Sequence, residues 1–175
     1  MASTYLTYTP SAGDATARQK WTWSAWVKRS KLGSSQFLFC GGDGGSYPTQ
    51  IYLSSGDVFA VYDTGENATA ATSAKLRDTS AWYHLLLSMD ATLSTASDRF
   101  KLYVNGTRET DFGSNINPPQ NSTEFVVNQN GATLAIGDYH GGSNNFDGCM
   151  SHFHFVDGTA YDPSTFGETD STTGE

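Results

Sequence analysis

The chain has 175 residues, of which 37% are hydrophobic, 13% aromatic and only 16% charged. This length suits one domain with a two-layer core, and no apolar run is long enough for a membrane-spanning helix. The formal net charge is −8, with all ten Lys and Arg at or before Arg108 and ten Asp and Glu after it. Such a distribution excludes a nucleic-acid-binding surface, which needs clustered cations, and favours a divalent cation as partner of the acidic part.

Large apolar residues alternate with small or polar ones in short segments along the whole chain. Successive side chains of a strand point to opposite faces, so this period of two predicts strands with one buried face. No segment predicts a helix. In chain order, strands are expected near residues 4–8, 21–29, 36–40, 50–54, 57–62, 82–90, 99–105, 107–112, 124–128, 132–137 and 148–156.

Turn residues separate these segments. Asn105-Gly106 predicts a type I′ hairpin, because both central residues of that turn need positive φ, and Ser55-Gly56 predicts a similar turn. Short strands with such turns indicate an all-β fold, an antiparallel two-sheet jelly-roll sandwich. Loops are expected in four polar or glycine-rich segments, residues 41–45, 63–74, 115–122 and 141–145.

Three aromatic-rich blocks carry a family resemblance. They read WTWSAWVK at 21–28, WYHLLLSMD and then FKLYVNG within 82–106, and IGDYHGGSNNFDGCMSHFHFVDG at 136–158. In order and chemistry they resemble the laminin-G-like branch of the concanavalin A-like lectin sandwiches, over about residues 4–166. With WVKRS early and DPSTFGETDSTTG at the end, the chain resembles most the version found in tailed-phage proteins.

The resemblance implies that the strands of the three blocks are neighbours in one sheet. It also implies a non-catalytic carbohydrate-binding or adhesion module, in a virion or outside the cell, that recognises a bacterial surface polysaccharide. The alternative is a virion decoration or assembly domain that binds no glycan, because one fold hosts many functions. Other virion subunits and further copies of the chain are the expected protein partners, with no nucleic acid and no membrane insertion.

The sandwich is expected to occupy residues 1–158. The polar tail, residues 159–175, is expected to pack on it through Tyr161 and Phe166, and its end is compatible with a further part of a longer protein. The first ten residues, MASTYLTYTP, lack the charged and apolar regions of a signal peptide.

The strand periodicity also predicts the core. Cys149 and Ser151 are expected to share a buried face with Phe153 and Phe155. Cys40 lies in an apolar strand. Free buried thiols are therefore favoured over a disulfide. The predicted core residues are Trp23, Val27, Leu85, Leu87, Phe100, Leu102, Phe153 and Phe155.

The opposite faces of the block strands bring Trp26, Lys28, His84, His152 and His154 onto one surface. The tryptophan and the three histidines form an alternative ligand face, because an aromatic ring can stack on a sugar and histidines can hydrogen-bond to it. Histidines also bind metals. The competing interpretation is a half-buried face covered by the tail or by a partner subunit.

Two glycine-rich loops supply the main ligand candidates, since the resemblance implies binding at the loop rim or on the concave sheet. Tyrosine rings can stack on a sugar, and asparagine amides offer both donors and acceptors. Ordinary surface loops are the alternative. The candidates are Asp43, Tyr47, Tyr139, His140, Asn144 and Asn145.

The second of these loops is also rich in oxygen ligands. Calcium takes about six to eight oxygens from carboxylates, amides and carbonyls, and many laminin-G-like domains hold it in a rim loop. The expected ligands are Asp138, Asn144, Asn145 and Asp147. Turn-capping by Asp and Asn is the alternative.

Catalysis is not expected. Glycoside hydrolases need two carboxylates facing across the scissile bond. Glu109 and Asp111 share a strand face, but Ser114 stands where the pattern of the sandwich hydrolases has a third acid. The chain has no nucleophile elbow, phosphate loop or dinucleotide fingerprint.

Overall fold

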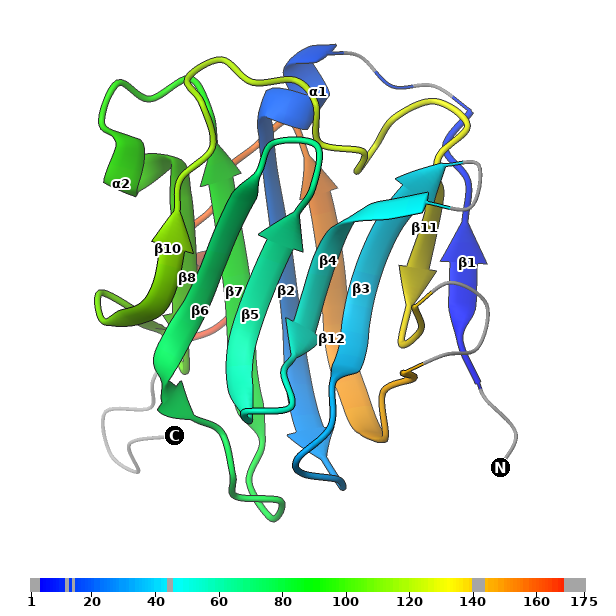
Figure 1. The fold of residues 1–175 in the computed structure, drawn as a ribbon, viewed down its shortest axis with the longest axis vertical. Helices are drawn as coiled ribbons and strands as arrows, with labels where there is room; N and C mark the ends of the chain where they lie inside the picture. The colour runs from blue at the N-terminus through cyan, green and yellow to red at the C-terminus, as the bar shows by residue number, and fades with distance from the viewer. Residues whose placement is uncertain (1–3, 12, 14, 44–45, 140–143, 169–175) are drawn as a thin grey trace.

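The strands form two antiparallel sheets packed face to face in a computed structural model of the chain (Figure 1). The structure describes residues 4–11, 13, 15–43, 46–139 and 144–168. This arrangement confirms the predicted all-β two-sheet sandwich, in which each sheet buries one face against the other.

The larger sheet has seven strands in the order β1-β11-β3-β4-β5-β6-β10. In Figure 1 its strands β3 to β6 lie in front of β2 and β7. Its strands span, in that order, Leu6–Tyr8, Thr133–Ile136, Gln36–Asp43, Ser46–Leu53, Val58–Asp63, Ala68–Lys75 and Phe112–Ile116.

The smaller sheet has five strands in the order β12-β2-β7-β8-β9. The three aromatic-rich blocks of the sequence supply β2, β7, β8 and β12, so they are neighbours in one sheet, as predicted. Its strands span Gly148–Asp157, Lys20–Arg29, Tyr83–Asp90, Phe100–Val104 and Thr107–Arg108.

Short helical turns connect some strands. They are α1 (Ala15–Gln19), α2 (Ala96–Arg99) and a 3₁₀ turn (Pro163–Thr165), all too short to show a helical period in the sequence. Among the described residues, none of the helices is both long and apolar enough to cross a membrane.

The predicted core lies between the sheets. Six of its eight residues are at most 2% exposed, and burying such side chains contributes about 1.5–3 kcal/mol each. Phe153 and Phe155 are half-buried but pack on the core, with ring centroids 6.1 Å from Trp23 and 5.8 Å from Trp21, respectively. The buried face predicted for β2 is confirmed, because Trp21, Trp23, Ala25 and Val27 all belong to the core.

One predicted hairpin is confirmed and the other differs. Asn105 and Gly106 have φ of 50° and 76°, as a type I′ turn requires. At the second turn the left-handed residue is Asp57 (φ 66°), and its N–H donates to Ser54 O at 2.9 Å. The β4–β5 connection therefore spans residues 54–57 and differs from the predicted two-residue turn.

Four segments were predicted wrongly. The expected loop 63–74 contains most of β6, whose small Ala68 and Ala70 are fully buried and give a weak strand signal. The expected loop 115–122 begins inside β10, and the expected strand 124–128 is irregular. The expected loop 41–45 overlaps the end of β3.

A bulge in β12 makes the predicted faces wrong for Cys149, Met150 and Ser151, which precede it, whereas Phe153 and Phe155 face the core as predicted. The register shifts between Ser151 and His154, and His152 has φ 47°. An extra residue reverses the alternation, so Met150 and Phe153 both pack on the core. Cys149 is consequently exposed rather than buried; it and the buried Cys40 are both free thiols.

Candidate functional site

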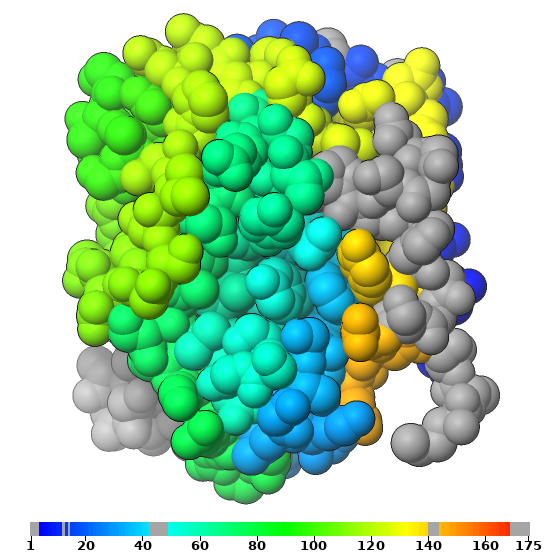
Figure 2. Space-filling view, viewed as in Figure 1, coloured from blue at the N-terminus to red at the C-terminus, as the bar shows by residue number. Residues whose placement is uncertain are grey.

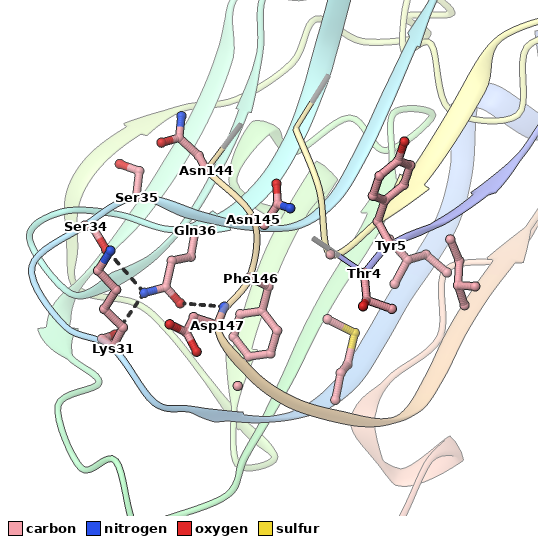
Figure 3. Close-up of a pocket in the computed structure, with 15 residues that line it drawn as sticks. Thr4, Tyr5, Lys31, Ser34, Ser35, Gln36, Asn144, Asn145, Phe146 and Asp147 are labelled. Atoms are coloured by element: carbon pink, nitrogen blue, oxygen red, sulfur yellow. Dashed lines mark hydrogen bonds between the residues drawn. The ribbon is translucent and has the colours of Figure 1, made fainter. Parts of the chain in front are cut away.

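A pocket of about 730 Å³ lies where the chain crosses from one sheet to the other (Figure 3). We call it the rim pocket. The β11–β12 connection, the β2–β3 connection and the segment around β1 form its walls. Residues of these walls include Thr4, Tyr5, Lys31, Ser34, Ser35, Gln36, Asn144, Asn145, Phe146 and Asp147.

Backbone contacts hold the described part of the β11–β12 connection in place. Phe146 N–H donates to Gly137 O at 3.0 Å, and Phe37 N–H of β3 donates to Asn144 O at 3.0 Å. At Gly148 a Cβ would lie 2.2 Å from Lys28 O, so only glycine lets β12 begin this close to β2.

Gln36 forms a fixed wall of the rim pocket. It is 2% exposed. Its Nε2 donates to Lys31 O at 2.9 Å and to Ser34 Oγ at 3.4 Å, and its Oε1 accepts the Asp147 N–H at 3.3 Å (Figure 3). Because both of its N–H donors and one acceptor position of Oε1 are engaged, this amide links the β2–β3 connection to the loop and has no donor left for a ligand.

The expected calcium ligands lie in different environments. Asp138 is 1% exposed, whereas Asn144 and Asp147 are exposed. The Asp147 carboxylate accepts the Ser30 hydroxyl at 2.5 Å, and its backbone O accepts Ser30 N–H at 2.8 Å. Across the described residues, no three His, Cys, Asp or Glu side chains group closely enough to hold a metal ion. Calcium also takes amide and backbone oxygens, so this finding does not test the predicted ligand set, and calcium binding stays a prediction.

The side chains best placed to meet a ligand are Asn144, Tyr5 and the hydroxyl residues Ser34 and Ser35. Asn144 is exposed, Tyr5 is 42% exposed, and the two serines are half-buried. Figure 3 shows Tyr5 across the pocket from the Asn144 side. Of these four, only Asn144 was predicted. The polar run SSQ at 34–36 is the signal that could have found the serines, whereas nothing in the sequence brings Tyr5 beside them.

Tyr139 lies outside the rim pocket wall. Its ring stacks on Phe37, with centroids 4.4 Å apart, and Phe37 stacks on Tyr52 at 5.1 Å. Burial, and the neighbouring Tyr62 of β5, raise the pKa of Tyr52. Figure 2 shows this side of the larger sheet, with β4 and β5 at its centre.

Three of the rim candidates have side chains that the structure does not describe. Asp43 and Tyr47 lie in β3 and β4, with side chains outside the described part, and His140 lies outside the described residues. Asn145 lines the rim pocket beside Asn144. The structure thus brings two of the six candidates together in the pocket and places a third, Tyr139, on a nearby aromatic stack.

The alternative ligand face is partly covered by the C-terminal segment, residues 159–168. The Phe166 ring lies 5.3 Å from that of His154 and 6.5 Å from that of His84. His84 Nε2 hydrogen-bonds with Ser24 Oγ at 2.8 Å beneath it. His152 lies at the bulge instead and bonds to the adjacent Ser151, so it separates from the other histidines.

Two antiparallel sheets with a ligand-sized pocket at the crossing between them define a lectin-like sandwich. Residues 2–162 match the family described as the concanavalin A-like lectin/glucanases superfamily, so the chain belongs to that family. A comparison with curated proteins finds no match.

Solved structures share the fold at low sequence identity. A native heptameric SAP-like pentraxin from Limulus polyphemus matches with TM-score 0.61 and 15% identity, over 97% of this chain and 76% of that one. The CBM40 of the Ruminococcus gnavus IT-sialidase, bound to α2,3 sialyllactose, matches with TM-score 0.58 and 13% identity, over 93% of each chain. Domain 4 of a GH43 extracellular arabinanase from Geobacillus stearothermophilus, in complex with arabinotriose, matches with TM-score 0.56 and 20% identity, over 85% and 65%.

Proposed function

We propose that the chain is a non-catalytic glycan-binding module and that the rim pocket holds the sugar. The observation that carries this proposal is the combination of an exposed Tyr5 ring with the Asn144 amide and two serine hydroxyls around one pocket. Binding sites for small molecules combine apolar surface with a few placed polar groups in this way.

The chemistry of the wall favours a neutral, hydroxyl-rich ligand. Tyr5 offers a ring face for the apolar side of a sugar, and Asn144 offers a donor and an acceptor for its hydroxyls. Lys31 and Asp147 bring one charge of each sign, and the Asp147 carboxylate is already engaged by Ser30. The wall therefore has no net charge that would select an anion or a cation.

Two relatives support a glycan as ligand, since the CBM40 and the arabinanase domain share the fold and were solved with bound saccharides. The more specific setting, a phage virion that recognises a bacterial surface glycan, rests on the sequence resemblance. Several copies on one particle would then convert weak single sites into firm adhesion. A virion decoration domain without glycan binding is the competing proposal.

Paired variants test the site. Tyr5→Ala should weaken binding to a glycan found on an array by about 2- to 10-fold, the range of one aromatic contact. Tyr8→Ala is its control, because Tyr8 is 64% exposed in β1, the strand that directly follows Tyr5, and is not among the residues that line the pocket. Asn144→Ala should also weaken binding. Asn121→Ala is its control, because both residues have positive φ, 53° and 59°, so both variants carry the same backbone strain.

The two proposals give different results. A wild-type chain that binds neither the array nor intact bacteria supports the decoration role. Glycan binding that survives both Tyr5→Ala and Asn144→Ala refutes the rim pocket and leaves Tyr139 and its aromatic stack as the next site to vary.

A further inference from the structure

A second pocket, of about 600 Å³, lies on the outer face of the five-stranded sheet. We call it the back pocket. The sheet forms one wall and the C-terminal segment, residues 159–168, forms the other. The side chains that matter below are Trp26, Trp82, His84, Asn105, Phe166 and Glu168.

Two partly exposed tryptophans are the main feature of the back pocket. Trp26 is 36% exposed and Trp82 is 42% exposed. Trp26 is the register partner of His84 in β7, Trp82 directly precedes β7, and both indoles line the back pocket. Trp26 also packs on His84, with ring centroids 5.1 Å apart. The two indoles therefore present apolar π surface to one pocket.

Specific hydrogen bonds position the opposite wall. Thr22 Oγ donates to Thr159 O and accepts Tyr161 N–H, both at 2.8 Å. Tyr103 donates its hydroxyl to Asp162 Oδ1 at 3.1 Å. Tyr161 then meets Phe166 edge to face at 6.2 Å. These contacts fix the segment up to Phe166, two residues before Glu168, which lines the pocket and is exposed.

The charge of the back pocket is negative. Glu168 is its one charged side chain among the described lining residues, which include neither Lys nor Arg. Burial, and the neighbouring His154, lower the pKa of His84, so that imidazole is neutral near pH 7. Lys28 points from the same face but lies outside the lining. Hydrogen bonds from Ser80, and the charge of Lys28, lower the pKa of Asp78.

We propose that the back pocket binds a small alkylammonium group, such as the trimethylammonium end of a larger molecule. The face of an indole attracts cations, and the attraction grows when the cation is partly desolvated. A carboxylate on the opposite wall adds to it, whereas an anion would be repelled. This activity is independent of glycan binding, because the two pockets share no lining residue.

Choline and its uncharged isostere 3,3-dimethyl-1-butanol separate a cation site from a merely apolar one. Each is titrated into the full chain labelled with ¹⁵N, with sodium chloride matching the ionic strength. The indole N–H signals of Trp26 and Trp82, assigned from Trp→Phe variants, report binding. Choline should give saturable shifts of both signals and the neutral alcohol should not.

Variants then locate the site. Trp82→Ala should weaken choline binding by about 5- to 30-fold, the range of a partly desolvated cation–π contact. Glu168→Gln should weaken it, whereas Glu109→Gln, an equal change of charge elsewhere, should not. Trp82 lies outside the strand and is partly exposed, so its variant is expected to fold, which an unchanged melting temperature checks.

Three results overturn the proposal: no saturable choline shift, equal shifts with the neutral alcohol, or unchanged affinity in Trp82→Ala and Glu168→Gln. Asn144→Ala in the rim pocket should leave choline binding intact. A failed glycan proposal and a failed alkylammonium proposal are therefore distinguished by separate ligands and separate variants.

Discussion

Asp57 stabilises the fold and also holds a connection that forms one wall of the rim pocket. It turns the β4–β5 connection and is 4% exposed. Its Oδ1 lies 3.1 Å from Arg29 and accepts Gly33 N–H at 2.8 Å, and its Oδ2 accepts Arg77 Nε at 3.0 Å. Arg29 is 1% exposed, and its guanidinium also donates to Lys31 O at 2.9 Å. Asp57 thus neutralises a buried arginine and, with it, anchors the β2–β3 connection.

Asp57→Asn removes the charge while keeping the size and the tolerance of positive φ. Leaving Arg29 buried without its counter-charge should cost about 3–5 kcal/mol. In a chain of this size that lowers the melting temperature by about 6–20 °C. Arg77→Ala removes the other ion pair of the same carboxylate. Because the Arg77 side chain is 58% exposed, that change should cost only about 0–1 kcal/mol.

The pH dependence follows from the direction of the Asp57 pKa. The hydrogen bond from Gly33 N–H, followed by Arg77 and Arg29, holds that pKa below its usual value. Because the folded-state pKa is lowered, the contribution of Asp57 to the free energy of unfolding is complete at pH values above its unfolded-state pKa of about 4. That contribution is lost as the pH falls through the folded-state pKa. The stability difference between wild type and Asp57→Asn should therefore shrink in acid.

Urea and thermal unfolding followed by circular dichroism, repeated from neutral pH into acid, measure both effects. Equal losses in Asp57→Asn and Arg77→Ala would refute the reasoning, because they would show that the buried partner contributes no more than the exposed one. A difference between wild type and Asp57→Asn that is constant with pH would contradict the assigned titration.

Three further predictions concern thiols, catalysis and calcium. In the native chain a thiol reagent should modify the exposed Cys149 quickly and the buried Cys40 only on unfolding. Burial, and the charge of Asp138, raise the pKa of Cys40 and so disfavour its reactive thiolate. Two fast-reacting thiols in a colorimetric assay would contradict this prediction. Replacing Glu109 with Gln and Asp111 with Asn should leave glycan binding intact, and loss of a polysaccharide-cleaving activity in that double variant would reverse the non-catalytic assignment. Calcium should raise the melting temperature if it binds only the folded loop, and identical curves in millimolar calcium and in excess chelator would end the calcium proposal.

Periodicity in β2 was enough to predict its buried face, because apolar residues occupy every second position from Trp21 to Val27 and all belong to the core. The same rule failed in β12, where the left-handed conformation of His152 inserts a bulge that no local pattern marks. It failed again in β6, because the core residues Ala68 and Ala70 are too small to give a strong alternation of apolar and polar side chains.

The rim pocket was only half predictable for a related reason. Asn144 and Asn145 are adjacent in sequence and lie in a segment with clear loop composition, so their joint position at the pocket could be expected. Tyr5 and Ser34 reach the same pocket from chain segments far from that loop. Their meeting depends on sheet order, in which β1 pairs with β11 and β11 with β3. Sheet order follows from tertiary packing and not from local residue types.

Both pockets are built from parts that add little to the core, and this separates binding from stability. Tyr5, Asn144 and Trp82 are exposed or partly exposed, and Glu168 lies in a segment packed on the outside of the sheet. Substitutions at such positions usually change stability by no more than about 0.5 kcal/mol. Asn144 is the exception, because its φ of 53° strains an alanine, and its binding loss is read against Asn121→Ala. Gly148 and Asp57 are the opposite case, because each fixes backbone that the pocket wall depends on. Loss of binding in the first group would therefore report a lost contact, whereas loss in the second would report a displaced wall.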